Sequence, residues 1–423
     1  MKITVVGGGS TYTPELVDGF ARLRELVPID ELCLVDTSET RLELVSGVSK
    51  RMFAKLGYSA KISATTDVVE GVRDADIVLL QIRIGGQAAR NGDETWPHEV
   101  CCIGQETTGP GGFAKALRTV PVVLDIAEAV RRYAKPDAWI IDFTNPVGIV
   151  TRALLEAGHR AVGLCNVAIG FQRHFATLLG VDHRNVTLQH VGLNHLTWER
   201  GVNVSTKTGT RDALDELLAA HLDEIAADVE LPASLLTMQH AVPSYYLRYY
   251  YAHDVVLREQ LTEPTRAHEV MQIEAALLTL YADPNVDAKP EELAKRGGAF
   301  YSEAAVDLIA SLTADRQDVQ VVNVRNDGAL PFLPDDHVIE VSATVGRSGL
   351  SILPIEPLPD DMAGLIAHVA GYERLALDAA IHGGRDRVVH ALLAHPLVGQ
   401  YDRAEKLADL LLAANRDHLA WAR

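Results

Sequence analysis

The chain has 423 residues, 48% of them hydrophobic and 23% charged, so it is long enough for two folded domains and too apolar for wholesale disorder. Its 39 Lys and Arg are outnumbered by 57 Asp and Glu, and the net charge of −18 argues against nucleic acid as a partner. The four Cys show no disulfide spacing, and we find neither a signal-peptide pattern nor a membrane-spanning run of about 18 apolar residues. These features predict a cytoplasmic protein without a membrane segment.

Short apolar runs alternate with helical patterns in the first third of the chain, which is typical of parallel βαβ units. The predicted strands are 3–6, 32–35, 61–65, 77–82, 139–143 and 161–164. The predicted helices are 14–26, 40–56 and 114–133. The fold class is therefore α/β, with a Rossmann-like doubly wound sheet in an N-terminal domain of residues 1–165.

The pattern changes after residue 165 to a mixture of strands and longer helices. The predicted strands are 186–191, 196–204, 319–324 and 338–341, and the predicted helices are 212–227, 266–281, 301–312, 361–380 and 402–422. We expect residues 166–423 to form a C-terminal mixed α+β domain. Because no flexible linker separates the two parts, a ligand site is expected in the crevice between them.

A glycine turn follows the first predicted strand and precedes the first predicted helix. Glycine lets the backbone turn tightly and approach a pyrophosphate, which the helix N-terminus favours. Tyr12 stands where a third glycine is usual, and Asp36 ends the second strand, where an acid binds ribose hydroxyls and favours NAD over NADP. The alternative is a plain turn with a surface Asp. We expect NAD to contact Gly7, Gly9, Ser10, Thr11 and Asp36.

A thiol, an imidazole and a run of tyrosines follow. Cys165 ends an apolar strand, and His195 ends the segment Gly-Leu-Asn-His, so the two could share a metal ion. From the spacing alone, a small buried Cys and an ordinary His are the simpler explanation. Five of the 12 Tyr lie within residues 243–251, where they could form a packing face, a subunit interface or a base whose pKa a cation lowers.

Ten short segments, in a consistent order over roughly residues 1–420, complete the pattern. They are 5–14, 83–86, 90–94, 105–112, 116–119, 144–146, 165–166, 192–195, 243–250 and 296–299. Together they resemble glycoside hydrolase family 4, and specifically its members that act on 6-phospho-β-glucosides. The resemblance implies a Rossmann domain, bound NAD and a divalent metal, often Mn²⁺.

The resemblance also implies roles for single residues. Cys165 and His195 would hold the metal, and Tyr246 would be the catalytic base, with Tyr245 as its rival. Substrate contacts are expected from Asn145, Asn166, Arg90 and Arg266. In the family, Cys-Asn-Val-Pro accompanies β-linked phosphoglucosides. This chain has Asn166 after the Cys, but Ala168 in place of the Pro, so related β-glucosides without phosphate remain an alternative.

The implied reaction differs from that of most glycosidases, which use two carboxylates. NAD oxidises carbon 3 of the sugar, the base removes the now acidic proton from carbon 2, the aglycone leaves, water adds, and the ketone is reduced again. Two other functions are considered. A 2-hydroxy-acid dehydrogenase would share the cofactor fold, and a non-catalytic NAD-binding sensor would share the glycine turn. We expect a homodimer or homotetramer.

Overall fold

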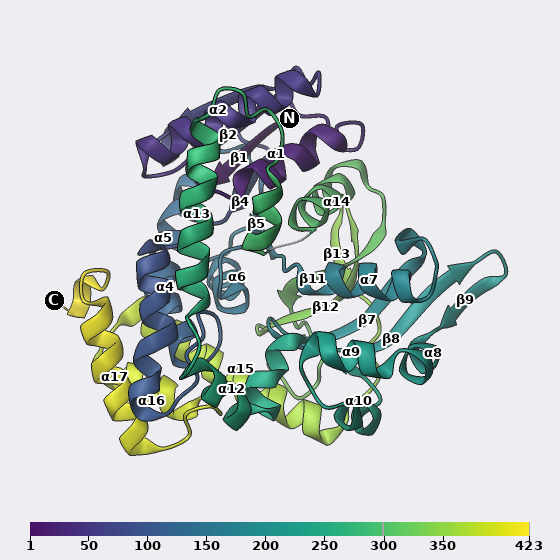
Figure 1. Ribbon diagram of the computed structural model, residues 1–423, viewed down its shortest axis with the longest axis vertical. Coiled ribbons are helices and arrows are strands. Elements are labelled where there is room, and N and C mark those ends of the chain that lie inside the picture. The colour runs from purple at the N-terminus through teal and green to yellow at the C-terminus, as the bar shows by residue number, and fades with distance from the viewer. Residues whose placement is uncertain (298–299, 423) are drawn as a thin grey trace.

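One mixed sheet runs through the computed structural model, which describes residues 1–297 and 300–422 (Figure 1). Within these residues the sheet has 13 strands in the order β10-β8-β7-β12-β11-β6-β5-β4-β1-β2-β3, with β13 added to β12 and β9 to β8. The strands are β1 (Lys2–Val6), β2 (Glu31–Val35), β3 (Lys61–Thr65), β4 (Ile77–Leu80), β5 (Trp139–Asp142), β6 (Ala161–Gly163), β7 (Val186–Leu193), β8 (Leu196–Thr206), β9 (Gly209–Asp212), β10 (Val242–Pro243), β11 (Asp318–Arg325), β12 (Val338–Gly346) and β13 (Gly349–Ile352).

The six N-terminal strands are parallel and follow the order 3-2-1-4-5-6 of a doubly wound dinucleotide-binding sheet. All four residues of β4 and of β5 are buried, as expected for parallel strands that are covered on both faces. The order reverses between β1 and β4, which is where such sheets bind their ligands. The Rossmann-like prediction is confirmed.

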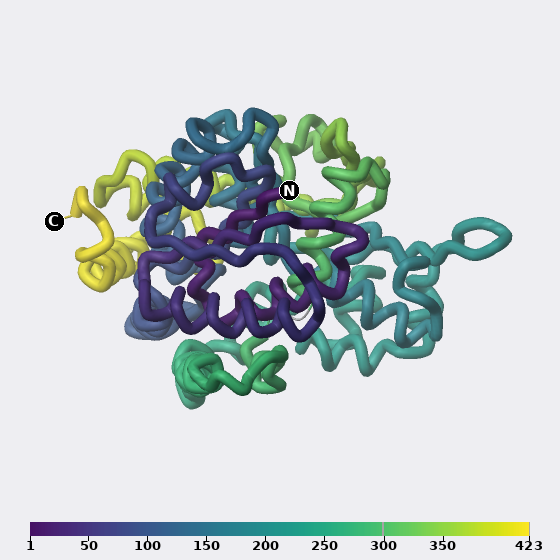
Figure 2. The backbone as a smooth tube through the Cα atoms, turned by 90° about the horizontal axis from the view of Figure 1, so that it is seen from above, coloured from purple at the N-terminus to yellow at the C-terminus, as the bar shows by residue number. Residues whose placement is uncertain are grey.

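The remaining strands extend this sheet in antiparallel fashion. A single residue pair, Gly163 with Asn323, joins β6 to β11, and β12, β7 and β8 follow. The β8–β9 hairpin projects from the body of the molecule (Figure 2). The C-terminal part therefore has the predicted α+β character, and the boundary at residue 165 stays a prediction.

The helices pack around the sheet (Figure 1), and they differ from the predictions in several places. They are α1 (Thr13–Arg22), α2 (Glu39–Lys55), α3 (Val68–Val72), α4 (Gly86–Thr95), α5 (Gly109–Tyr133), α6 (Val147–Glu156), α7 (Val167–Leu178), α8 (Leu214–Ala220), α9 (Leu222–Val229), α10 (Ala233–Gln239), α11 (Arg248–Tyr251), α12 (His253–Gln260), α13 (Arg266–Ala282), α14 (Tyr301–Ala314), α15 (Asp360–His382), α16 (Arg385–Ala394) and α17 (Tyr401–Asn415). The predicted helix 14–26 ends at Arg22, the predicted helix 114–133 begins at Gly109, and several other helices were not predicted. The helix predicted at 212–227 breaks at His221, because α8 packs on β8 while α9 packs on α10. The last predicted helix ends at Asn415 instead of residue 422.

Two features of this arrangement position the site. The carboxyl ends of β1, β2, β4, β5 and β6 meet at one edge of the sheet, because these strands are parallel. Helix α13 comes from the C-terminal half of the chain but packs against α2 and α4 of the N-terminal half (Figure 1), so it lies beside that edge. Among the described residues, no helix combines the length and the apolar character needed to cross a membrane.

Candidate active site

A cavity of about 1100 Å³ lies along the carboxyl ends of the parallel strands. Gly7, Ser10 and Asp36 line it in one region, and Asn145, Asn166 and Tyr246 line it in another. The predicted crevice site is therefore one continuous space that holds residues from both parts of the chain.

The glycine turn has the geometry of a cradle. Gly7 has φ +88°, and a Cβ there would lie 2.6 Å from the Gln81 carbonyl oxygen, so only glycine fits. The Gly9 N–H donates to the Asp36 carboxylate at 3.0 Å, and Asp36 also accepts from Ser38 N–H at 3.0 Å. Thr11 is fully buried, and its hydroxyl donates to Glu274 at 3.4 Å. The turn, the strand-end acid and the start of α1 fit a dinucleotide.

Cys165 lies between the end of β6 and the start of α7. Burial raises the pKa of its thiol, and the Glu340 carboxylate raises it further. Three N–H donors oppose this by favouring the thiolate: the backbone N–H groups of Val167 and Asn166 and the side chain of Asn194. The sulfur thus sits at a helix start with donors already directed at it, which suits a thiolate metal ligand.

His195 occupies the two-residue turn between β7 and β8, where Leu193 pairs with Leu196. Its φ of +63° is strained for a non-glycine residue, and such strain gathers at functional sites. Gly192 makes the turn possible, because a Cβ there would lie 2.1 Å from the Leu196 carbonyl oxygen. The segment Gly-Leu-Asn-His is therefore a hairpin that presents an imidazole.

The contacts of Thr107 match the tautomer of His195 that leaves Nε2 free for a metal ion. The Thr107 hydroxyl donates to Gln105 Oε1 at 2.8 Å and lies 2.9 Å from His195 Nδ1. The hydroxyl has one proton, and when it donates that proton to Gln105, Nδ1 carries a proton of its own and donates to the hydroxyl oxygen. Burial lowers the pKa of His195 to about 4, so the ring is neutral. The lone pair on Nε2 is then available to a metal ion.

Two neighbouring tyrosines take different places. The Tyr246 ring stacks on the His195 ring, with centroids 3.6 Å apart and planes 4° from parallel. Burial raises the pKa of Tyr246, the Cys165 and Glu106 charges add to this effect, and Arg90 opposes it. The Tyr245 hydroxyl instead accepts from Arg248 at 2.9 Å. Of the two candidates for the base, only Tyr246 stacks on His195.

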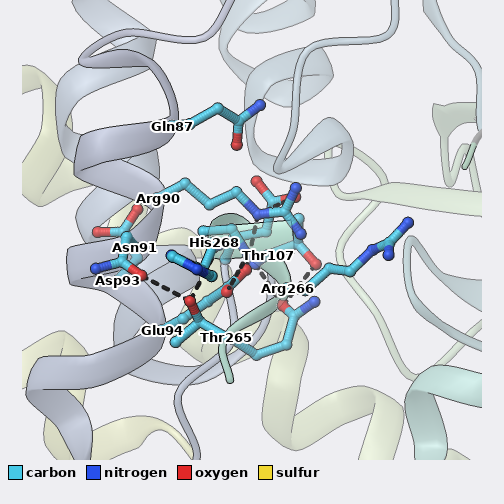
Figure 3. Close-up of polar contacts among 12 residues, drawn as sticks. Gln87, Arg90, Asn91, Asp93, Glu94, Thr107, Thr265, Arg266 and His268 are labelled. Atoms are coloured by element: carbon cyan, nitrogen blue, oxygen red, sulfur yellow. Dashed lines mark hydrogen bonds and ion pairs between the residues drawn. The ribbon is translucent and has the colours of Figure 1, made fainter. Parts of the chain in front are cut away.

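A group of charged side chains from α4 and the start of α5 lines the same cavity. Arg90 Nε donates to Glu94 at 2.7 Å and lies 3.3 Å from Glu106, which also accepts from Lys115 at 2.7 Å. Figure 3 shows α4 presenting Arg90 and Glu94 toward the segment that begins α13. Arg266, at that beginning, lines the cavity and is half-exposed, bonding to Glu269. Both predicted arginines thus reach the cavity.

The donors around Cys165 and His195 fit a divalent cation. His195 offers Nε2, Cys165 offers sulfur, and the buried Asn145 Oδ1 has no hydrogen-bond partner within the described residues. Among residues 1–297 and 300–422, no group of three or more His, Cys, Asp and Glu side chains is placed to hold a metal ion. A cation here would therefore combine two protein ligands with oxygen donors from amides or a substrate.

Several site residues were not identified as functional from the sequence. Gln105, Glu106 and Thr107 belong to a segment that carried the resemblance, but no role was predicted for them. Asn194 belongs to the segment 192–195, but no role was predicted for it, and Glu340 gave no signal in the sequence. Two residues of the segment 296–299, Gly298 and Ala299, lie outside the described residues.

The fold and the site define an α/β enzyme built on a dinucleotide-binding sheet, and comparison with known proteins identifies its kind. Residues 2–181 match the family 4 glycosyl hydrolases, and residues 190–398 match the C-terminal domain of that family. The chain belongs to glycosyl hydrolase family 4. This membership decides against the dehydrogenase and sensor alternatives.

Two relatives and one solved structure are similar over nearly the whole chain. A probable 6-phospho-β-glucosidase of Bacillus subtilis is 39% identical, over 99% of this chain and 97% of its own. The 6-phospho-β-glucosidase of Escherichia coli is 34% identical, over 99% and 96%. The structure of the Thermotoga maritima 6-phospho-β-glucosidase with manganese, NAD⁺ and glucose-6-phosphate has a TM-score of 0.90 at 34% identity, over 99% of both chains.

Proposed function

We propose that this protein hydrolyses 6-phospho-β-glucosides with a bound NAD and a divalent cation, most readily Mn²⁺. The observation that carries the proposal is the single cavity that reaches from the glycine turn to Asn166, the neighbour of Cys165, and to Tyr246, which stacks on His195. A dinucleotide and a sugar bound there would meet in one cavity. The relatives described above bear this enzyme name, and the Thermotoga structure holds manganese, NAD⁺ and glucose-6-phosphate.

The proposed β linkage and the 6-phosphate have support in two further features. Asn166 follows Cys165, as in the β-specific family members that this sequence resembles. Ala168, which replaces their Pro, is 4% exposed and is the second residue of α7. Either residue is tolerated in a first helical turn, and Ala168 packs in the core, so the exchange leaves the wall of the cavity unchanged.

The chain's own residues have distinct tasks in this reaction. Asn145 and Asn166 bind the sugar hydroxyls, and Arg90 and Arg266 bind the substrate through charge. Cys165 and His195 hold the cation, and Tyr246 takes the proton from carbon 2. When bound, NAD supplies a hydride acceptor for carbon 3, and the cation supplies positive charge that makes carbon 2 acidic and favours ionised Tyr246. Gly7, Gly9, Ser10, Thr11 and Asp36 hold the dinucleotide.

The test is product analysis in heavy water with a nitrophenyl β-glucoside, with and without a 6-phosphate, in the presence of NAD and Mn²⁺. The proposal expects nitrophenol release that requires NAD, and deuterium at carbon 2 of the product. Tyr246→Phe should abolish the exchange, and the matched variant Tyr245→Phe should keep it. Release of nitrophenol without deuterium at carbon 2 would refute the mechanism. The oligomeric state and the cytoplasmic location remain predictions from the sequence.

A further inference from the structure

A buried chain of three ionisable side chains lies behind the Cys165 and His195 site. His190 Nδ1 lies 2.6 Å from Glu199 Oε1, and His190 Nε2 lies 2.9 Å from Glu340 Oε1. All three residues are at most 2% exposed. They come from the neighbouring strands β7, β8 and β12 (Figure 1), where His190 pairs with Glu199 across β7 and β8.

The geometry of His190, Glu199 and Glu340 indicates the charges of these three side chains. A carboxylate accepts hydrogen bonds, and an imidazolium donates from both ring nitrogens, so a charged His190 ring matches its place between the two glutamates. Burial opposes this charge, but Glu199 and Glu340 raise the pKa of His190 to about 10. Two carboxylates and one imidazolium leave a net charge of −1 inside the protein. Such an arrangement is costly to bury, and nothing in the proposed chemical step uses it directly.

The second carboxylate oxygen of Glu340 connects these three buried side chains to Cys165 and His195. Glu340 Oε2 accepts from Asn194 Nδ2 at 2.7 Å and from Asn323 Nδ2 at 2.8 Å. The NH₂ group of Asn194 therefore faces Glu340, and the same side chain donates to the Cys165 sulfur. A flipped amide would turn its oxygen toward a carboxylate and a thiolate, which repel it. Asn194 also directly precedes His195 in the strained hairpin turn.

We propose that Glu340, held by His190 and Glu199, is a positioning residue that acts through Asn194 to fix Cys165 and the His195 turn for cation binding. Glu340 orients the amide, the amide orients the sulfur, and the net negative charge favours a cation nearby. This inference rests on the proposed function, because it requires that Cys165 and His195 hold the cation. Supporting partners of metal ligands are commonly worth about 10–100-fold in metal affinity.

The test measures the affinity of the full-length, NAD-loaded protein for Mn²⁺ by electron paramagnetic resonance of the free ion. Glu340→Gln is expected to weaken Mn²⁺ binding about 10–100-fold. The matched control is Glu199→Gln, an equally buried carboxylate that contacts His190 but not Asn194, and it should weaken binding much less. Because Glu340 also bonds Asn194 and Asn323, Glu340→Gln should be the less stable of the two variants, so thermal unfolding is measured first and Mn²⁺ binding is compared at a temperature where both are fully folded.

A double-mutant cycle decides whether Glu340 acts through Asn194. Asn194→Ala alone should weaken Mn²⁺ binding by a similar factor, and adding Glu340→Gln should cause little further loss. If Glu340→Gln does not fold, Asn194→Ala still tests the link, because it removes the amide between Glu340 and the sulfur and leaves Glu340 its bonds to His190 and Asn323. Wild-type affinity in Asn194→Ala, or equal losses in the two Glu variants, overturns the inference. Failure of the wild-type protein to bind Mn²⁺ would instead overturn the metal assignment in the proposed function.

Discussion

Replacing Thr107 by Val tests whether the tautomer of His195 controls cation binding. Thr107 is the only link between the fixed acceptor Gln105 and the Nδ1–H of His195, at 2.8 and 2.9 Å within the described structure. Val has nearly the same shape as Thr but cannot accept a hydrogen bond. The variant leaves a buried N–H without a partner, or lets the proton move to Nε2, where it blocks the lone pair that a metal needs.

Two independent estimates give the size of this effect. A buried donor left without a partner costs about 1–3 kcal/mol. Loss of the partner of a metal-bound His lowers metal affinity about 10–100-fold, which is about 1.4–2.7 kcal/mol at 1.36 kcal/mol for each factor of ten. We therefore expect Mn²⁺ affinity to fall about 10–100-fold in Thr107→Val, with NAD affinity unchanged.

The assay is a Mn²⁺ titration of the NAD-loaded protein, monitored by electron paramagnetic resonance. Thr108→Val is the matched control, because Thr108 is adjacent, is at least as buried as Thr107, and makes no side-chain capping bond to α5. Unchanged Mn²⁺ affinity in Thr107→Val, or an equal loss in Thr108→Val, would refute the assignment of the tautomer.

Three further predictions concern the cation, the cofactor and stability. Cys165→Ser should lower activity by more than about 100-fold while NAD binding, measured by intrinsic fluorescence, survives; full activity of this variant after chelator treatment would exclude Cys165 as a ligand. NADP should bind at least about tenfold more weakly than NAD, because the Asp36 carboxylate repels a 2′-phosphate, and tighter binding of NADP in parallel titrations would show that Asp36 does not face the ribose. The two carboxylates raise the pKa of His190 from 6.5 to about 10 against the effect of burial, so their stabilisation is complete below pH 6.5 and is lost as the pH rises through about 10. Denaturant unfolding between pH 7 and pH 10 should therefore show a steeper loss of stability in the wild-type protein than in His190→Gln, and equal slopes would count against the imidazolium.

The parallel strands could be predicted because the sequence carries them locally. A run such as Ile77–Leu80 is apolar throughout, and this is the pattern of a strand that is buried on both faces. Helix α4 gave no such signal, because its sequence is mostly polar and has two glycines. Its place depends on contacts distant in the sequence: Glu94 accepts from Ala267 N–H at 2.8 Å, and Asn91 accepts from Thr265 at 2.6 Å (Figure 3).

The site residues that could be predicted are those with a local sequence pattern, and the missed ones depend on contacts that are distant in the sequence. Cys165 and Asp36 could be located because the carboxyl ends of parallel strands share one edge, a rule that needs only the strand positions. Glu340 lies about 150 residues from His190 in the chain, and only the pairing of β12 with β7 sets Glu340 opposite Gly192. No periodicity in the sequence encodes that register. The choice between Tyr245 and Tyr246 is also geometric, since adjacent residues in a tight turn point in different directions.

The continuity of the sheet explains how one site can be assembled from both parts of the chain. Cys165 follows β6, the last parallel strand, and His195 follows β7, which lies in the antiparallel extension. Between these two strands stand only β11 and β12, and β12 carries Glu340. The relative position of thiol and imidazole is therefore set by backbone hydrogen bonds of a buried sheet and not by a flexible interface between domains. We therefore expect the affinity for the cation to depend on the register of the strands between β6 and β7. A substitution that weakens the single β6–β11 pair, Gly163 with Asn323, should reduce Mn²⁺ binding before it reduces NAD binding, because the dinucleotide cradle lies wholly on the parallel side.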